Sequence, residues 1–183
     1  MFTQHTVFTQ HTMESAPPAS RRAMAAVAGK WGYLPAGVAL LAESPEALEG
    51  FLRMTAAFDA CTLDRLAREV VIMTVAVRNG CHLCVAVHTA RLADFGADPA
   101  LAAALRSAAP LADARLEAVR AFTLRVLDTA GGAGEESLAG FLGHGFTARN
   151  ALEIVLGIGA YTLSTFANRL TGAPVDQALR AFA

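Results

Sequence analysis

The sequence predicts an all-α protein built around a helical hairpin that carries a C-x-x-C motif at a helix N-terminus. Apolar residues recur at helical spacing along most of the chain, and no segment alternates like a strand between hairpin turns. Capping residues, prolines at helix starts and glycines at helix ends separate the apolar runs. Together, these three observations favour a helical bundle.

Length and composition fit one domain that is rich in small apolar residues. The chain has 183 residues, 54% of them hydrophobic, and its mean hydropathy is +0.40. Buried subunit interfaces would absorb this excess, so we expect a homo-oligomer. Because F-T-Q-H-T occurs twice and a polar, proline-containing segment follows, we expect residues 1–18 to be a disordered leader and residues 19–183 to be the domain.

The charge balance argues against nucleic acid as a partner. The formal net charge is -1, so no basic field is available to hold phosphates. The uncharged stretch 154–168 is too short to span a membrane. The N-terminus lacks a basic start followed by an apolar block, and three cysteines are an odd number for a disulfide framework. We therefore expect a cytoplasmic protein that binds neither nucleic acid nor a membrane.

Start and stop signals divide the chain into expected helices. These cover residues 21–30, a short stretch after Pro35, 45–60, 63–78, 81–95, 99–107, 114–130, 137–142 and 148–171, with a terminal turn from residue 174. Ser44 and Pro45 give a clear start, since a capping serine precedes a proline at the first helical position. Ser20 and Thr62 are expected to cap the helices that follow them. Gly96 gives a clear stop after the motif helix.

Cys81 and Cys84 form the C-x-x-C motif directly after Asn79 and Gly80, which break the preceding apolar run. Cys81 then lies near an N-cap, and both sulfurs fall in the first helical turn. Backbone N–H groups and the helix dipole stabilise a thiolate there, and they can lower a cysteine pKa from about 8.5 to between roughly 3.5 and 7.5. The pattern predicts a dithiol that attacks an electrophile.

Two further side chains complete the candidate site. His88 follows Cys84 by four residues, so a helix places its imidazole on the same face one turn along. Glu69 is the only carboxylate in an otherwise apolar run. If the helices on either side of the break pack as an antiparallel hairpin, Glu69 can reach His88 and hold its tautomer, giving a Glu-His-Cys relay. We expect His82 to be an exposed modulator of the thiol pKa.

This spacing, E-x11-C-x2-C-x3-H after T-L-D-R-L-A-R-E, resembles the redox-active branch of the AhpD-like alkylhydroperoxidase and carboxymuconolactone decarboxylase family. The resemblance extends from residues 31–35 through Ser44 to Asn168. It implies an AhpD-like helical bundle that assembles as a trimer or a multiple of it. One position departs from the pattern, because AhpD has a histidine where this chain has Leu83, and the histidine here is His82.

By this resemblance, Cys84 is the peroxidatic thiol and Cys81 resolves it as an intramolecular disulfide, while Glu69 and His88 relay the proton. The implied partners are a hydroperoxide substrate and a dithiol reductant, for which a lipoyl-bearing protein or a peroxiredoxin is a candidate. No cofactor is implied. The resemblance therefore predicts a thiol-dependent peroxidase or disulfide reductase.

Alternative interpretations of the motif are a metal site, a non-redox enzyme and a regulated interaction protein. Structural zinc takes four ligands, and the chain has no second C-x-x-C or H-x3-H pair. Haem attachment needs a histidine where Val85 stands. The decarboxylase branch would act on a lactone without a redox step, whereas an interaction protein would use the disulfide to change its assembly. We interpret Cys61 as a small buried hydrophobe, and Glu153 and Asn168 as helix–helix hydrogen-bonding residues.

Overall fold

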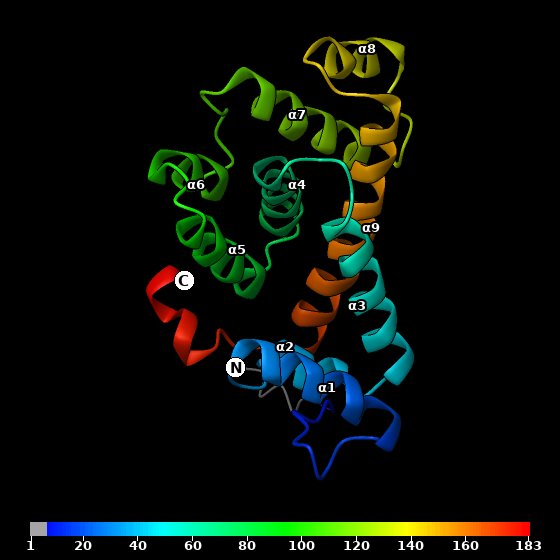
Figure 1. Cartoon of the computed structure of the whole chain (residues 1–183), viewed down its shortest axis with the longest axis vertical. Helices are drawn as coiled ribbons and strands as arrows, with labels where there is room; N and C mark the ends of the chain where they lie inside the picture. The colour runs from blue at the N-terminus through cyan, green and yellow to red at the C-terminus, as the bar shows by residue number, and fades with distance from the viewer. Residues whose placement is uncertain (1–6) are drawn as a thin grey trace, which may run out of the picture.

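Helices make up the regular structure of this protein in the computed structural model, which describes residues 7–183 (Figure 1). They are α1 (Pro18–Trp31), α2 (Ala36–Leu41), α3 (Pro45–Asp59), α4 (Arg65–Arg78), α5 (His82–Asp94), α6 (Pro99–Arg106), α7 (Ala114–Asp128), α8 (Glu135–Gly143), α9 (Ala148–Thr171) and the 3-10 helix η1 (Gln177–Phe182). No strand occurs in residues 7–183, so the all-helical prediction is confirmed. Within that range, no helix is both long and apolar enough to cross a membrane.

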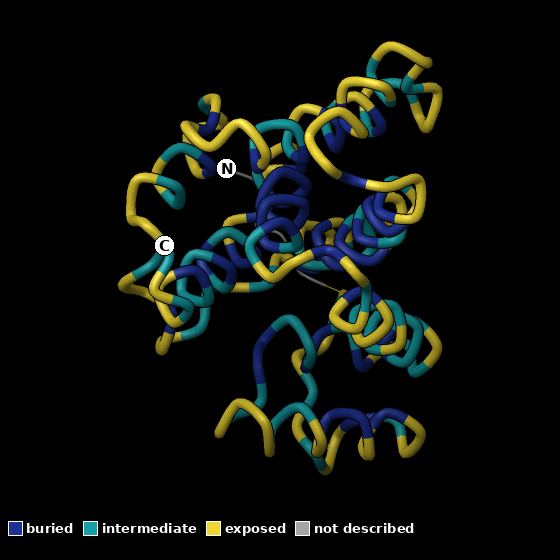
Figure 2. Tube along the Cα trace, turned by 45° about the horizontal axis from the view of Figure 1, so that its top comes forward, coloured by how far each residue is buried: buried dark blue, intermediate teal, exposed yellow. Residues whose placement is uncertain are grey.

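The central helix is α4. The Asp64 carboxylate caps it by accepting the Ala67 N–H at 2.9 Å. Residues 69–76 are all buried, and buried residues are drawn dark blue in Figure 2. Because α5, α6, α7 and α9 all pack against α4, residues 69–76 are buried on every side of the helix rather than along one stripe. Glu69 is the one charged side chain in this buried stretch.

The longest helix, α9, runs beside α3 and α4 (Figure 1). Thr147 and Asn150 form a capping box at its start. Further along, Gly157 brings α9 close to its neighbours, since a Cβ there would lie 2.7 Å from the Phe58 ring and 3.0 Å from the Val71 side chain. Only glycine permits this approach, which holds α9 firmly against the core.

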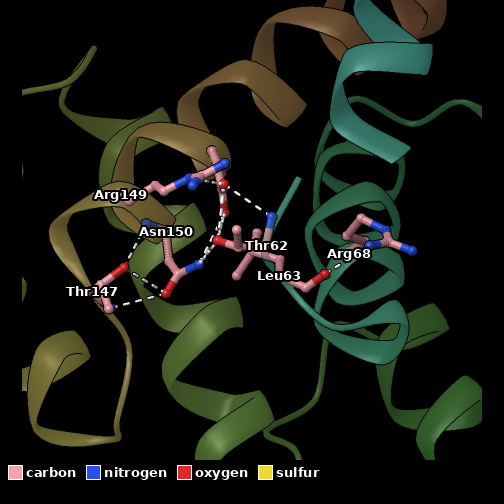
Figure 3. Close-up of polar contacts among 7 residues, drawn as sticks. Thr62, Leu63, Arg68, Thr147, Arg149 and Asn150 are labelled. Atoms are coloured by element: carbon pink, nitrogen blue, oxygen red, sulfur yellow. Dashed lines mark hydrogen bonds and ion pairs between the residues drawn. The ribbon is translucent and has the colours of Figure 1, made fainter. Parts of the chain in front are cut away.

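A polar cluster ties the first turns of α9 to the segment before α4, and we call it the Glu153 clamp (Figure 3). The Glu153 carboxylate accepts the Thr62 N–H at 3.0 Å and the Thr62 hydroxyl at 2.8 and 2.9 Å. The Asn150 amide and the Arg149 guanidinium each donate to it at 2.9 Å. Burial raises the pKa of Glu153, but these donors outweigh it and lower the pKa to about 2. Glu153 is therefore an ionised structural carboxylate.

Two expected caps are wrong. Thr62 does not cap α4, which begins at Arg65 behind the Asp64 cap, because the Thr62 hydroxyl is bonded to Glu153. Ser20 does not begin a helix either, since α1 starts at Pro18 and the buried Ser20 hydroxyl donates to the Ala42 carbonyl at 2.7 Å. The other α-helices agree with the expected ranges to within two residues at each end.

The segment before α1 contacts the domain over part of its length. The His11 N–H donates to the Ala39 carbonyl at 3.2 Å, and the His11 ring lies 2.8 Å from the Glu43 carboxylate. Ala16 is buried, and Met13 packs against the small core formed with α1 and α3. These contacts differ from the expected disordered leader over residues 1–18, of which residues 1–6 lie outside the described part of the chain.

Candidate active site

The two cysteines lie at the turn between α4 and α5. Gly80 has φ +65°, a left-handed conformation that favours glycine. The Asn79 amide donates to the Thr165 hydroxyl at 2.9 Å, which ties this turn to α9. Cys81 is the N-cap of α5, and its sulfur accepts the Cys84 N–H at 3.5 Å. Both sulfurs therefore lie at the helix start, where the sequence predicts them.

Both thiols are free, buried and in contact with polar groups of α9. The Asn168 amide nitrogen lies 3.3 Å from the Cys84 sulfur and 3.8 Å from the Cys81 sulfur. The Ser164 hydroxyl lies 3.6 Å from the Cys84 sulfur. Asn168, interpreted from sequence as a helix–helix hydrogen-bonding residue, joins α9 to α5 in this way, and the groups that it bonds are the two thiols. The structure thus adds two residues to the predicted site.

The two thiols differ in acidity because they interact. A hydrogen bond from Cys84 is the main cause that lowers the pKa of Cys81 to about 6, and the Cys84 N–H and the Asn168 amide contribute against the effect of burial. The pKa of Cys84 is raised by that same hydrogen bond, by burial and by the charge on Cys81. The hydrogen bond between the two sulfurs therefore favours the thiolate on Cys81 and the protonated thiol on Cys84.

The predicted pair of Glu69 and His88 is formed. Glu69 Oε2 lies 2.6 Å from His88 Nδ1, and both side chains are buried. Arg91 Nε lies 3.4 Å from the other Glu69 oxygen. Burial raises the pKa of Glu69, but the His88 and Arg91 charges and the His88 hydrogen bond outweigh it, so the pKa is lowered. Glu69 therefore holds the imidazole in a fixed orientation, and the Tyr161 ring packs edge-on against it at 5.3 Å between ring centroids.

The third link of the expected relay is not a direct contact. The polar side chains bonded to the Cys84 sulfur are Ser164 and Asn168, and no hydrogen bond joins His88 to either sulfur within the described residues. His82 is exposed and takes no part in the thiol hydrogen bonds of this region. Cys61 is partly buried against the main core, and burial is the main cause that raises its pKa.

A cavity of about 200 Å³ adjoins the site. Cys84 and His88 both line it, whereas Cys81 does not. Its opposite walls are mainly apolar and come from α1, α2 and α3, with Phe51 among them. Leu83, which stands where AhpD has a histidine, also lines this cavity. Cys84 is thus the sulfur that faces the space where a small molecule could bind.

The sequence contained a signal for the residues of α9 that were missed. Ser164 and Asn168 are polar residues four apart in the uncharged stretch 154–168, so a helix places them on one face. That face meets the motif helix. No group of three or more His, Cys, Asp or Glu side chains in residues 7–183 is arranged to hold a metal ion.

Residues 42–124 match the carboxymuconolactone decarboxylase family. Among solved structures, a peroxidase-related protein from Ralstonia eutropha JMP134, described as an alkylhydroperoxidase AhpD core, superposes with a TM-score of 0.82 at 23% identity, covering 94% of this chain and 93% of that chain. A peroxidase-related protein from Silicibacter sp. TM1040 gives a TM-score of 0.79 at 22% identity, covering 98% of this chain and 97% of that chain.

The same fold occurs in a protein with another activity. The debrominase Bmp8, in a cysteine-to-alanine variant bound to 2,3,4-tribromopyrrole, superposes with a TM-score of 0.79 at 15% identity, covering 98% of this chain and 96% of that chain. No curated protein sequence matches the chain. The match of residues 42–124 to the carboxymuconolactone decarboxylase family and the shared fold agree with the predicted resemblance, and the chain has the AhpD-like helical fold.

Proposed function

We propose that this protein is a thiol-dependent peroxidase that reduces organic hydroperoxides through Cys84 and Cys81. One observation carries the proposal: Cys84, one sulfur of a buried dithiol, lines a mainly apolar cavity that His88 also lines, while Cys81, whose pKa is lowered, lies next to it. A thiolate is the nucleophilic form of cysteine, and a mainly apolar cavity suits the organic part of a hydroperoxide.

The reaction begins with a proton transfer within the pair. The Cys84 proton moves to Cys81, and the Cys84 thiolate attacks the distal oxygen of the hydroperoxide. The O–O bond breaks, Cys84 becomes a sulfenic acid, and the alkoxide takes up a proton to leave as an alcohol. The Cys81 sulfur then attacks the sulfenic acid, which forms the Cys81–Cys84 disulfide and releases water. An external dithiol returns both thiols and is itself oxidised to a disulfide.

In this mechanism His88 acts on the substrate oxygen. It lines the cavity beside Cys84. Its Nδ1 is hydrogen-bonded to Glu69, so Nε2 is the nitrogen that can exchange a proton with a substrate in the cavity. As the imidazolium, His88 donates its Nε2 proton to the departing alkoxide and regains a proton from solvent, a general-acid step typically worth about 10² to 10⁴ in rate. Asn168 and Ser164 hold the sulfurs through their hydrogen bonds.

The reductant belongs to the proposal as a chemical class. A dithiol is needed, because a single turnover leaves two sulfurs oxidised. By family resemblance, lipoyl-bearing proteins and a peroxiredoxin are the candidates. The two can be compared as electron donors in the same assay.

A thiol titration tests the function. Reduced protein mixed anaerobically with one equivalent of cumene hydroperoxide should lose two thiols, release one equivalent of cumyl alcohol and regain both thiols with dithiothreitol. Cys61→Ala should behave as the wild type, and peptide mapping should find the disulfide between Cys81 and Cys84.

Other outcomes identify the alternatives. Thiols that stay reduced while a lactone is decarboxylated would indicate the decarboxylase activity. Release of bromide from 2,3,4-tribromopyrrole, with no alcohol from the hydroperoxide, would indicate a debrominase. Oxidation without repeated turnover in excess dithiothreitol would indicate a redox-regulated interaction protein.

A further inference from the structure

One face of α9 is apolar and uncovered. Leu152, Val155, Phe166 and Leu170 are 73%, 48%, 57% and 72% exposed. They are four of the seven large hydrophobic side chains exposed in residues 7–183. Scattered exposed apolar residues are ordinary on a protein surface, but a group confined to one helix indicates a contact surface.

Together with the exposed Gly159 and the half-buried Leu163, these four residues form a continuous stripe. We call it the α9 stripe, and it comprises residues 152, 155, 159, 163, 166 and 170. At 3.6 residues per turn these positions fall within an arc of about 80°. Ser164 and Asn168, which face the thiols, lie on the opposite side of the helix. No charged residue occurs from Ile154 to Asn168, so nothing in the middle of the stripe favours solvent.

The α9 stripe reads nearly the same in both directions. Read inward from its two ends, Leu152 corresponds to Leu170, Val155 to Phe166, and Gly159 to Leu163. When two identical helices pack antiparallel about a two-fold axis near residue 161, Leu152 faces Leu170 and Gly159 faces Leu163, while Val155 and Phe166 are offset by one residue. A two-fold interface must be self-complementary in this way. The pattern therefore fits a second copy of the same helix rather than an unrelated surface.

Gly159 is compatible with the same arrangement, because the protein's own packing leaves open space at this position. A Cβ at Gly159 would meet nothing within 4 Å, whereas a Cβ at Gly157 would lie 2.7 Å from the Phe58 ring. Gly29, Gly50 and Gly140 in other helices also have open space at the Cβ position, so Gly159 matters here through its place in the α9 stripe. In the antiparallel pair, Gly159 lies opposite Leu163 of the second copy and makes room for its side chain.

We propose that two copies of this protein associate through antiparallel packing of their α9 stripes, with Leu152 of one copy against Leu170 of the other. This contact is independent of the thiol chemistry, since the stripe and the thiol face lie on opposite sides of α9. It also gives the apolar excess of the sequence a specific location.

Cross-linking tests the register. In the double variant Leu152→Cys/Leu170→Cys, mild oxidation should link residue 152 of one copy to residue 170 of the other, as peptide mapping can show. Within one helix these positions are 18 residues, or about 27 Å, apart, too far for a disulfide. The control Leu142→Cys/Leu170→Cys should give no link between its introduced cysteines. Links from 152 to 152, or none, would overturn the proposed pairing.

Sedimentation of the full chain tests the association itself. Wild-type protein at micromolar concentration should have twice the 19.1 kDa chain mass or an even multiple of it. Gly159→Leu should lower the association constant at least tenfold and leave the helix content of the separated copies intact, because the free surface has room for the side chain. Leu142→Glu on α8 should associate like the wild type.

Two sedimentation results would contradict the proposal. One is a monomeric wild type, and the other is an assembly that Gly159→Leu and Phe166→Glu both leave unchanged. A larger assembly that falls to half its mass in Gly159→Leu would support the same contact.

Discussion

Both halves of α9 carry polar side chains that face inward, but the groups that these side chains bond differ. Near its start, Glu153 accepts hydrogen bonds from Thr62, Asn150 and Arg149 in a closed cluster. Near its end, Asn168 and Ser164 meet two thiols, one of which lines a cavity. A cluster whose polar groups bond only one another stabilises the fold. Polar groups that bond a nucleophilic sulfur beside a cavity can instead influence a reaction of that sulfur. Changes at the two ends should therefore affect different measurements.

The largest effect is expected at the thiol end. His88→Ala should slow reduction of cumene hydroperoxide by about 10²-fold, because the departing alkoxide loses its proton donor. The thiolate absorbance titration should change little, since His88 has no hydrogen bond to either sulfur. A variant that shifts the thiol pKa as strongly as it slows turnover would show that His88 acts on the sulfur instead.

A change in the Glu153 clamp should lower the stability of the fold. Glu153→Gln should lower the free energy of unfolding by about 2 kcal/mol, because a charged acceptor of several hydrogen bonds is lost, and Tm by roughly 4 to 8 °C. The pKa of Glu153 is lowered from 4.5 to about 2, so its stabilising effect is complete above 4.5 and is lost as pH falls toward 2. The difference between variant and wild type should shrink over that range, while peroxide reduction at pH 7 stays unchanged.

Asn168→Ala should have a smaller effect than the two variants above, and it should change the acidity of the thiols rather than mainly the stability of the fold. It removes a donor to both sulfurs, so the pKa of Cys81 should rise from about 6 by about one unit. The thiolate absorbance titration measures this shift directly. In the wild type, a lowered thiol pKa stabilises the fold as pH rises through 6, and Asn168→Ala should weaken that rise. An unshifted titration would make Asn168 a structural residue like Glu153.

Gly37→Ala should give the smallest change. A Cβ at this position in α2 would lie 2.7 Å from the Asn168 amide oxygen and 3.2 Å from the Leu83 side chain. Both are ends of flexible side chains that can shift, so we expect about a threefold loss of peroxide reduction and an intact fold. Gly159→Ala, in open space on the same helix as Asn168, is the matched control for the activity. A rise in the pKa of Cys81 as large as in Asn168→Ala would mean that the amide can no longer donate to the sulfurs.

Local pattern was enough to predict most of the fold and half of the site. Helix starts such as Ser44 and Pro45, and the Cys81 N-cap, depend on neighbouring residues and were found where the sequence placed them. The contact between Glu69 and His88 was also predictable, because one hairpin joins them. Asn168 reaches the thiols from 84 residues away in sequence, and the Thr62 hydroxyl is taken by Glu153 from 91 away. Such contacts depend on how helices pack, which local patterns do not specify.

The measurement that tests the central claim most directly is trapping of the first oxidised sulfur. Single-cysteine variants of the pair are treated with one equivalent of cumene hydroperoxide in the presence of dimedone, and the labelled residue is identified by mass spectrometry. The cavity predicts that Cys81→Ser forms a sulfenic acid on Cys84, and that Cys84→Ser forms none on Cys81, although Cys81 has the lower pKa. Rapid labelling of Cys81 in Cys84→Ser, with no label on Cys84 in Cys81→Ser, would contradict the account and make Cys81 the attacking thiol.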